Sequence, residues 1–146
     1  MRYWDDLELG EVHELGPITV SQEEMVEFAL RYDAQPFHVD PEAAKETPFG
    51  GLIASGWQTT ALFMSLYARD VLNHQAGVGG GAVDELRFRA PVRPEDTLHM
   101  RTTVVELWPS TKGLPRGSVV SEVEIRNQRD ELVLTMRIGG FVARRP

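Results

Sequence analysis

The chain has 146 residues, enough for one domain with a hydrophobic core, and we treat residues 1–146 as that domain. Its formal net charge is −7 and no basic stripe offsets it, which argues against a nucleic-acid partner. The absence of cysteine excludes a disulfide framework and thiolate chemistry. Because the first residues also lack the features of a secretory signal, we expect a cytoplasmic protein.

The N-terminal part of the chain is predicted to form a short strand and then a helix. Residues 12–15 favour a strand. Ser21 and Glu24 form a capping box, and the apolar residues that follow recur at helical spacing as far as Tyr32. We expect this helix to deliver the chain to Asp33.

A carboxylate and an imidazole then lie five residues apart, on either side of a proline. Pro36 lacks a backbone N–H and pushes Gln35 towards extended geometry, so one helix should not run from Asp33 to His38. We therefore expect both side chains on a loop, where functional groups often collect. Histidine titrates near neutrality, and an aspartate can hold its tautomer or share a water with it. From the spacing alone, a capping Asp and a surface His are an alternative interpretation.

The next segment is predicted to contain a short helix and a glycine turn. Asp40 and Pro41 indicate a helix N-cap and first residue, and residues 47–51 should end this helix. Phe49 could line a pocket, although an aromatic residue beside a Gly-Gly turn is as often plain packing. The uncharged span 47–68 is too polar and too interrupted by Pro and Gly for a transmembrane helix, so we expect no membrane contact.

The longest predicted helix begins at Gly56, after the favourable N-cap Ser55, and runs to about Leu72. Apolar side chains occur on nearly every face, which predicts a helix surrounded by protein. Its free N–H groups and positive pole lie at its start, where a carbonyl group would be polarised as in an oxyanion hole. Gly56 could equally serve only the close packing of helix and loop.

The C-terminal half of the chain is predicted to form a sheet. Residues 73–81 are rich in glycine and indicate a loop. Four strands are then predicted, at residues 83–88, 97–107, 118–126 and 132–142. Successive hairpins favour an antiparallel sheet, and one long buried helix against that sheet makes an α+β fold.

Residues 33–40 and 49–57 together form a longer pattern. It resembles the MaoC-like dehydratase and (R)-specific enoyl-CoA hydratase family, whose motif is Asp-x-Asn-Pro-x-His-x-Asp, followed by a Phe-Gly turn and a His-Gly at the start of a central helix. The resemblance extends to residues 83–94 and covers most of the chain. There are departures: Gln35 stands where the hydratases usually have Asn, and Ser55 where many have His. Met64 stands where some place a pocket serine.

The resemblance implies a hotdog fold, in which an antiparallel sheet wraps around a long central helix. It also implies a hydro-lyase of fatty acid metabolism that adds water to, or removes it from, the C2–C3 bond of an acyl thioester. The substrate would be attached to CoA or to an acyl carrier protein, with no metal and no further cofactor. A homodimer or larger homo-oligomer is expected.

The resemblance also assigns roles to residues of the motif. Asp33 and His38 would be catalytic and together hold one water molecule. The N–H of Gly56 would stabilise charge on the thioester oxygen. Further contacts to substrate are expected from Ser55, Phe49 and Gly51.

Arg87, Arg89 and Arg93 cluster outside these motifs. Such a patch could bind the phosphates of CoA, although more often it is a solvated face. The histidines other than His38 are scattered without the spacing of metal ligands.

Two other functions remain open. A hotdog thioesterase would use a carboxylate near the same helix to direct water at the thioester carbonyl, whereas the Asp33-to-His38 spacing and the break at Pro36 favour a hydratase. A non-catalytic acyl-CoA-binding protein is the second alternative, and the departures at Gln35 and Ser55 keep it open.

Overall fold

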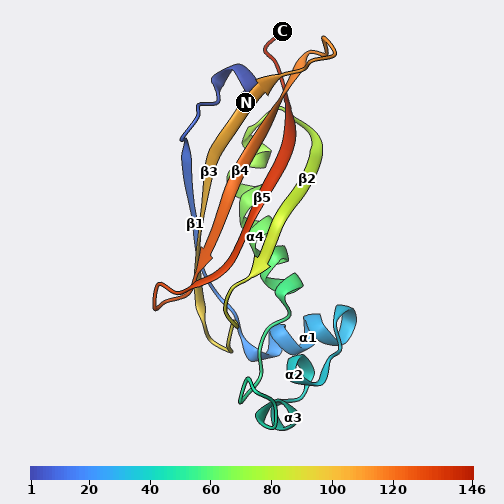
Figure 1. Cartoon of the computed structure of the whole chain (residues 1–146), viewed down its shortest axis with the longest axis vertical. Helices are drawn as coiled ribbons and strands as arrows, with labels where there is room; N and C mark the ends of the chain where they lie inside the picture. The colour runs from blue at the N-terminus through green and yellow to red at the C-terminus, as the bar shows by residue number, and fades with distance from the viewer.

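The computed structural model describes residues 1–146 and shows an antiparallel sheet packed on one long helix (Figure 1). The strands are β1 Val12–Thr19, β2 Gly77–Phe88, β3 Thr97–Pro109, β4 Arg116–Arg126 and β5 Leu132–Ala143. Their order across the sheet is β1-β3-β4-β5-β2, and every neighbouring pair is antiparallel. The α+β prediction is therefore confirmed, and β1 and β2 form the two edges of the sheet.

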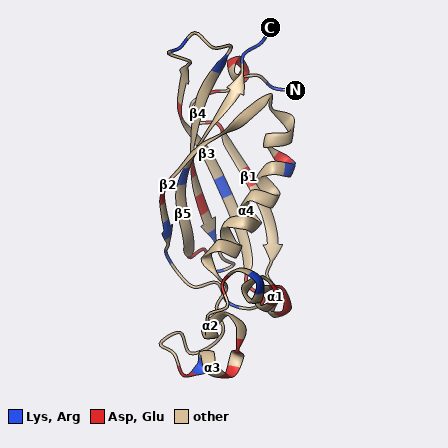
Figure 2. Ribbon diagram, turned by 90° about the vertical axis from the view of Figure 1, so that its right-hand side faces the viewer, with Lys and Arg blue, Asp and Glu red and all other residues tan.

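Three of the four α-helices gather at one end of the sheet, and the fourth lies along it (Figure 1). The helices are α1 Gln22–Tyr32, α2 Pro36–Val39, α3 Pro41–Lys45 and α4 Gly56–Asp70, with short 3-10 turns at Trp4–Asp6 and Leu72–His74. Helix α4 lies along one face of the sheet, and α1, α2 and α3 sit beside its N-terminal end (Figures 1 and 2). None of the helices combines the length and hydropathy that a membrane crossing requires.

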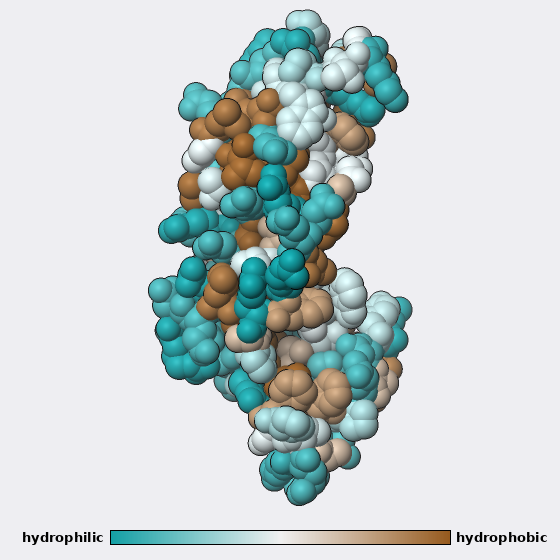
Figure 3. All heavy atoms as spheres, viewed as in Figure 1, coloured by the Kyte–Doolittle hydropathy of each residue, from teal (hydrophilic) through white to brown (hydrophobic).

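The hydrophobic core lies between α4 and the sheet. Phe63 of α4 is fully buried in one cluster with Met100, Ile125 and Leu134 of the strands. The opposite side of α4 is open, because Trp57 is 57% and Met64 45% exposed. The sequence predicted a helix surrounded by protein. In a single copy of the chain this is wrong for the side of α4 that carries Trp57 and Met64. On the sheet face that looks away from α4, polar and apolar residues are interspersed (Figure 3).

The glycine-rich segment expected to be a loop is largely strand. β2 begins at Gly77, and Gly77 and Gly79 pair with Val142 and Phe141 of β5. Glycine weakens a strand, but the backbone groups of β5 offer partners that a single-sequence pattern does not reveal. Register shifts between Gly77 and Gly79 and further along β2 accommodate the unusual backbone, including a φ of 133° at Gly79.

β1 is also longer than the segment 12–15 predicted for it. It continues past Gly16 and Pro17 to Thr19, with a register shift against β3 between Leu15 and Ile18. Pro17 interrupts the hydrogen bonds between β1 and β3 but does not end the strand. A bulge on an edge strand can accommodate the missing N–H of a proline.

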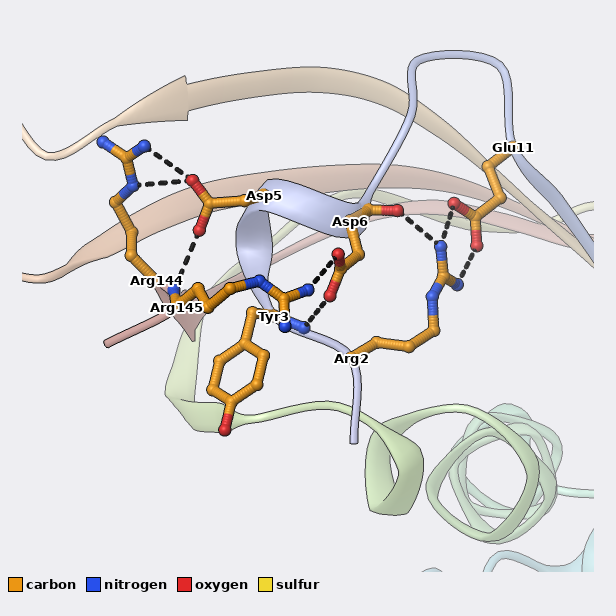
Figure 4. A network of polar contacts seen from close by, with 7 residues as sticks. All are labelled: Arg2, Tyr3, Asp5, Asp6, Glu11, Arg144 and Arg145. Atoms are coloured by element: carbon orange, nitrogen blue, oxygen red, sulfur yellow. Dashed lines mark hydrogen bonds and ion pairs between the residues drawn. The ribbon is translucent and has the colours of Figure 1, made fainter.

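Ion pairs tie the two chain termini together at the end of the sheet remote from α1 (Figures 1 and 4). Asp5 accepts hydrogen bonds from Arg144 at 2.6 and 3.0 Å, and Asp6 pairs with Arg145. Arg2 pairs with Glu11 in the same network. The side chains of these pairs are 17–58% exposed, so solvent screens them and each pair contributes little to stability. The network attaches the N-terminal segment to the residues that follow β5.

Candidate active site

Asp33 and His38 come from two consecutive helices that a proline separates. The first helix, α1, ends at Tyr32, and the N–H of Asp33 still donates to the carbonyl of Ala29. Pro36 breaks the helix as predicted but also occupies the first position of the one-turn helix α2. His38 therefore lies on a helix and not on a loop. The prediction missed this because proline is unfavourable inside a helix but favourable at its start.

The imidazole of His38 is buried and has a defined orientation. Only 5% of the residue is exposed, and its Nδ1 lies 2.8 Å from the carbonyl oxygen of Ile53. Because a carbonyl oxygen can only accept, Nδ1 must carry a hydrogen. In the neutral ring, Nε2 is then an acceptor, and it faces Oδ2 of Asp33 at 3.3 Å.

The carboxylate of Asp33 is surrounded by donors. Gln35 Nε2 donates to Oδ1 at 2.8 Å, and Ser55 Oγ donates to Oδ2 at 2.8 Å. Burial by itself would raise the pKa of Asp33, but these hydrogen bonds, together with the Coulomb attraction of His38 when its ring is protonated, outweigh burial and lower the pKa below its ordinary value. The side chain is therefore held as a carboxylate at neutral pH.

Ser55 links this carboxylate to the start of α4. Its hydroxyl is fully buried, donates to Asp33 and accepts from the N–H of Trp57 at 3.3 Å. The N-cap role was predicted from the sequence, but the contact with Asp33, 22 residues earlier in the chain, was not. Gln35 and Ser55 both depart from the family motif, and both donate to the same carboxylate.

The pair opens into a cavity of about 510 Å³ at the N-terminal end of α4. Its walls include Asp33, His38, Phe49, Gly56, Trp57 and Phe88. The N–H of Gly56 has no acceptor within the chain, so it is free for a bound group.

Gly56 is also a point of close packing. A Cβ at this position would lie 2.5 Å from the ring of Phe88. That ring meets Trp57 edge to face, with centroids 5.8 Å apart. The geometry is thus compatible with both expectations for Gly56, which are close packing of the helix start and an N–H that is free to bind a carbonyl group. Phe88 and Trp57 were not expected at the cavity, because nothing in their local sequence distinguishes them from core or surface aromatics.

The other residues expected to contact substrate lie in different places. Phe49 lines the cavity. Gly51 does not line it, and its carbonyl instead accepts from Arg93 Nη1 at 3.4 Å. Ser55 lies behind Asp33 and does not line the cavity either. The substrate contacts of these three residues stay predictions.

The arrangement places two proton acceptors and one free donor around a single cavity. Oδ2 of Asp33 and Nε2 of His38 cannot hydrogen-bond to each other without a proton, but a water molecule can donate to both. The Gly56 N–H at the positive end of α4 can stabilise a developing negative charge. Together these groups suit the addition of water to a polarised bond.

The chain belongs to the MaoC-like domain family, whose model matches residues 8–125. It is 34% identical to the 3-hydroxybutyryl-CoA dehydratase of Methylorubrum extorquens, over 94% of this chain and 93% of that protein. It is 28% identical to the uncharacterised protein YdeM of Bacillus subtilis, over 96% and 98% of the two chains. The crystal structure of a MaoC-like dehydratase from Rhodospirillum rubrum superposes with a TM-score of 0.87 at 36% identity, covering 99% and 98%. The hotdog fold expected from the resemblance is thereby confirmed.

We predict that Ser55→Ala raises the pKa of Asp33, because it removes a donor to the carboxylate and leaves burial to oppose the charge. Carbon-13 NMR titration of the Asp33 carboxyl group measures this directly. Ser65→Ala is the matched control, since the Ser65 hydroxyl bonds only its own helix. Ser55→Thr should restore the wild-type titration. An unchanged or lower pKa in Ser55→Ala would show that the serine does not stabilise the carboxylate.

Proposed function

We propose that this protein catalyses the reversible hydration of 2-enoyl-CoA thioesters to 3-hydroxyacyl-CoA thioesters. The observation that carries the proposal is the approach of Asp33 Oδ2 to His38 Nε2, 3.3 Å apart, in a cavity that the free N–H of Gly56 also lines. A 3-hydroxybutyryl-CoA dehydratase and an (R)-specific enoyl-CoA hydratase among the relatives support the choice of reaction.

The thioester carbonyl would accept a hydrogen bond from Gly56 N–H. Helix α4 has 15 residues, and its first N–H groups present the positive end of the helix dipole to the cavity. This interaction draws electron density from the conjugated double bond, which makes C3 electrophilic. It strengthens as negative charge develops on the thioester oxygen, so it lowers the barrier and not only the energy of the bound substrate.

One water molecule would donate to both Asp33 Oδ2 and His38 Nε2. Its oxygen forms the new bond to C3, and one of its protons passes to the Asp33–His38 pair. The electron pair of the double bond moves towards the thioester oxygen, and C2 then takes a proton back from the pair. Both the hydroxyl group and the new C2 hydrogen come from this water, and the reverse sequence is dehydration.

Within the pair, the geometry favours His38 Nε2 as the proton acceptor. The hydrogen on Nδ1 is held by the Ile53 carbonyl, which leaves the Nε2 lone pair towards the water. Asp33, with its lowered pKa, is the weaker base, and its charge stabilises the imidazolium that forms. The two groups act as one coupled unit during turnover.

We predict that Asp33→Asn and His38→Ala each lower turnover of crotonyl-CoA at least ~100-fold, the usual scale for the loss of an acid–base group. The assay follows enoyl absorbance and free thiol together on purified protein, with circular dichroism to verify folding. His99→Ala, an exposed histidine on β3, is the control and should retain wild-type turnover.

The two signals of this assay, enoyl absorbance and free thiol, also distinguish a hydratase from a thioesterase and from an acyl-CoA-binding protein. Thiol release by the wild-type protein would replace the proposal with a thioesterase. Loss of enoyl absorbance that persists in both folded variants would remove Asp33 and His38 from the mechanism. If crotonyl-CoA and longer enoyl-CoAs bind but neither signal changes, the protein is an acyl-CoA-binding member of the family.

We also infer that two copies of the chain associate through β2. This strand pairs only with β5, so its outer edge presents unpaired backbone groups. Val83 on β2 is 60% exposed, and it lines one cavity with Met64, which lies on the open side of α4. Pairing of two β2 edges about a two-fold axis would continue the sheet across both copies and cover this apolar face.

We predict that light scattering after size-exclusion chromatography gives about 33 kDa, twice the 16.4 kDa of the chain, as a two-fold dimer requires. Val83→Glu should elute as a folded monomer, because the new charge would be buried against the partner. Val12→Glu, on the opposite edge strand, is the control and should stay dimeric. A monomeric wild-type protein, or a dimeric Val83→Glu variant, would contradict this interface.

A further inference from the structure

The cavity that Asp33 and His38 line has a further polar side chain in its wall, that of Thr59 on α4. Thr59 is only 3% exposed, and its hydroxyl forms no hydrogen bond within the chain. The enclosed polar side-chain atoms that lack a partner are His13 Nε2 and Gln58 Oε1. The Thr59 hydroxyl lacks a partner too but is not enclosed, so its accessible surface faces the cavity.

The other small hydroxyl residues of α4 use their hydroxyl groups within the helix. Thr60 Oγ1 donates to the carbonyl of Gly56 at 2.8 Å, and Ser65 Oγ donates to the carbonyl of Leu62 at 2.7 Å. Serine and threonine often bond to their own backbone in this way when they lie inside a helix. Thr59 does not, so its O–H donor is available to a group bound in the cavity.

The position of Thr59 on the helix brings this hydroxyl close to the catalytic pair. Thr59 follows Ser55 by four residues, and its N–H donates to the Ser55 carbonyl at 3.3 Å. Residues four apart on a helix are neighbours, and side chains lean towards the N-terminus of the helix. The Thr59 side chain therefore extends towards Ser55, whose own hydroxyl donates to Oδ2 of Asp33.

The pair itself offers only acceptors to a bound water molecule. These are the carboxylate of Asp33 and Nε2 of His38, because the hydrogen of the neutral ring is on Nδ1. A water molecule that donates both hydrogens to the pair and directs one lone pair at C3 has its other lone pair left without a donor. The hydroxyl of Thr59 is a donor in the same cavity, and it complements the pair.

We propose that the Thr59 hydroxyl donates a hydrogen bond to the oxygen that the reaction adds to C3, which makes Thr59 a further catalytic residue. This role rests on the proposed function. In hydration, the bond fixes the direction in which the water oxygen faces C3. In dehydration, the oxygen leaves with the electron pair of its bond to C3 and takes a proton from the Asp33–His38 pair, which regains a proton from C2. The hydroxyl then stabilises the negative charge that develops on the leaving oxygen.

Isothermal titration calorimetry with two acyl-CoA thioesters of equal chain length tests this contact without turnover. Acetoacetyl-CoA has an oxygen on C3 that can only accept hydrogen bonds, butyryl-CoA has none, and neither gains or loses water. We expect Thr59→Val, which replaces the hydroxyl by a methyl group, to lower the preference for acetoacetyl-CoA over butyryl-CoA about fivefold. This is the usual contribution of one neutral hydrogen bond. Thr59→Ser should keep the wild-type preference.

Turnover of crotonyl-CoA gives a second measurement on the same variants. Thr59→Val should lower kcat at least ~10-fold and leave KM within about twofold, because the hydrogen bond strengthens as charge develops on the oxygen. Thr59→Ser should restore most of kcat. Thr60→Val is the matched control, since the Thr60 hydroxyl bonds its own helix and the residue does not line the cavity. It should keep the wild-type binding preference and kcat.

An unchanged binding preference in Thr59→Val, with folding verified by circular dichroism, would overturn the proposal. An equal loss in Thr60→Val, or no recovery in Thr59→Ser, would also overturn it, because the effect would then come from packing of the helix. If hydration depends on Asp33 and His38 but the preference does not depend on Thr59, the contact fails and the proposed function stands. If the preference depends on Thr59 but the wild-type protein does not hydrate crotonyl-CoA, the proposed function fails and the contact stands. Wild-type protein that binds neither thioester would contradict both.

Discussion

The hydrogen bond from Ser55 to Asp33 is the contact on which the geometry of the site depends. The serine hydroxyl is fully buried, and it joins the carboxylate to the first turn of α4. The Asp33–His38 pair and the free N–H of Gly56 are thereby held in fixed relative positions, although they come from different elements. The buried hydroxyl of Ser55 both donates and accepts, so it has little freedom to reorient. The distance between the Asp33 carboxylate and the first turn of α4 is therefore fixed by this contact and the packing around it.

The core around α4 explains how this arrangement is kept rigid. Phe63 and the sheet residues around it hold the helix along its length, and the Phe88 ring lies against Gly56 at its start. A side chain at position 56 would displace this ring and the N-terminal turn together. The same glycine therefore serves both packing and access to the N–H, and one function does not exclude the other.

Sequence reasoning predicted most of the fold but only part of the site. The break at Pro36, the helix beginning at Gly56 and the C-terminal strands follow from local chemistry, because turn residues and periodicity act over short distances. The start of β2 at Gly77 was missed, since its pairing with β5 is long-range and overrides the preference of glycine for loops. For the same reason the sequence could not show that Ser55 bonds Asp33, that Phe88 reaches the cavity or that Gly51 lies outside it. The departures from the family motif become intelligible only in three dimensions, where Gln35 and Ser55 both donate to one carboxylate.

The most direct test of the account is where the oxygen of water is incorporated. The protein would be incubated with crotonyl-CoA in water enriched in oxygen-18, and the products analysed by mass spectrometry. The account predicts intact 3-hydroxybutyryl-CoA with one oxygen-18 in the C3 hydroxyl group, formed at least ~100-fold more slowly with Asp33→Asn. Oxygen-18 in a free carboxylate, accompanied by released CoA, would place the attack at the thioester carbonyl and contradict the account.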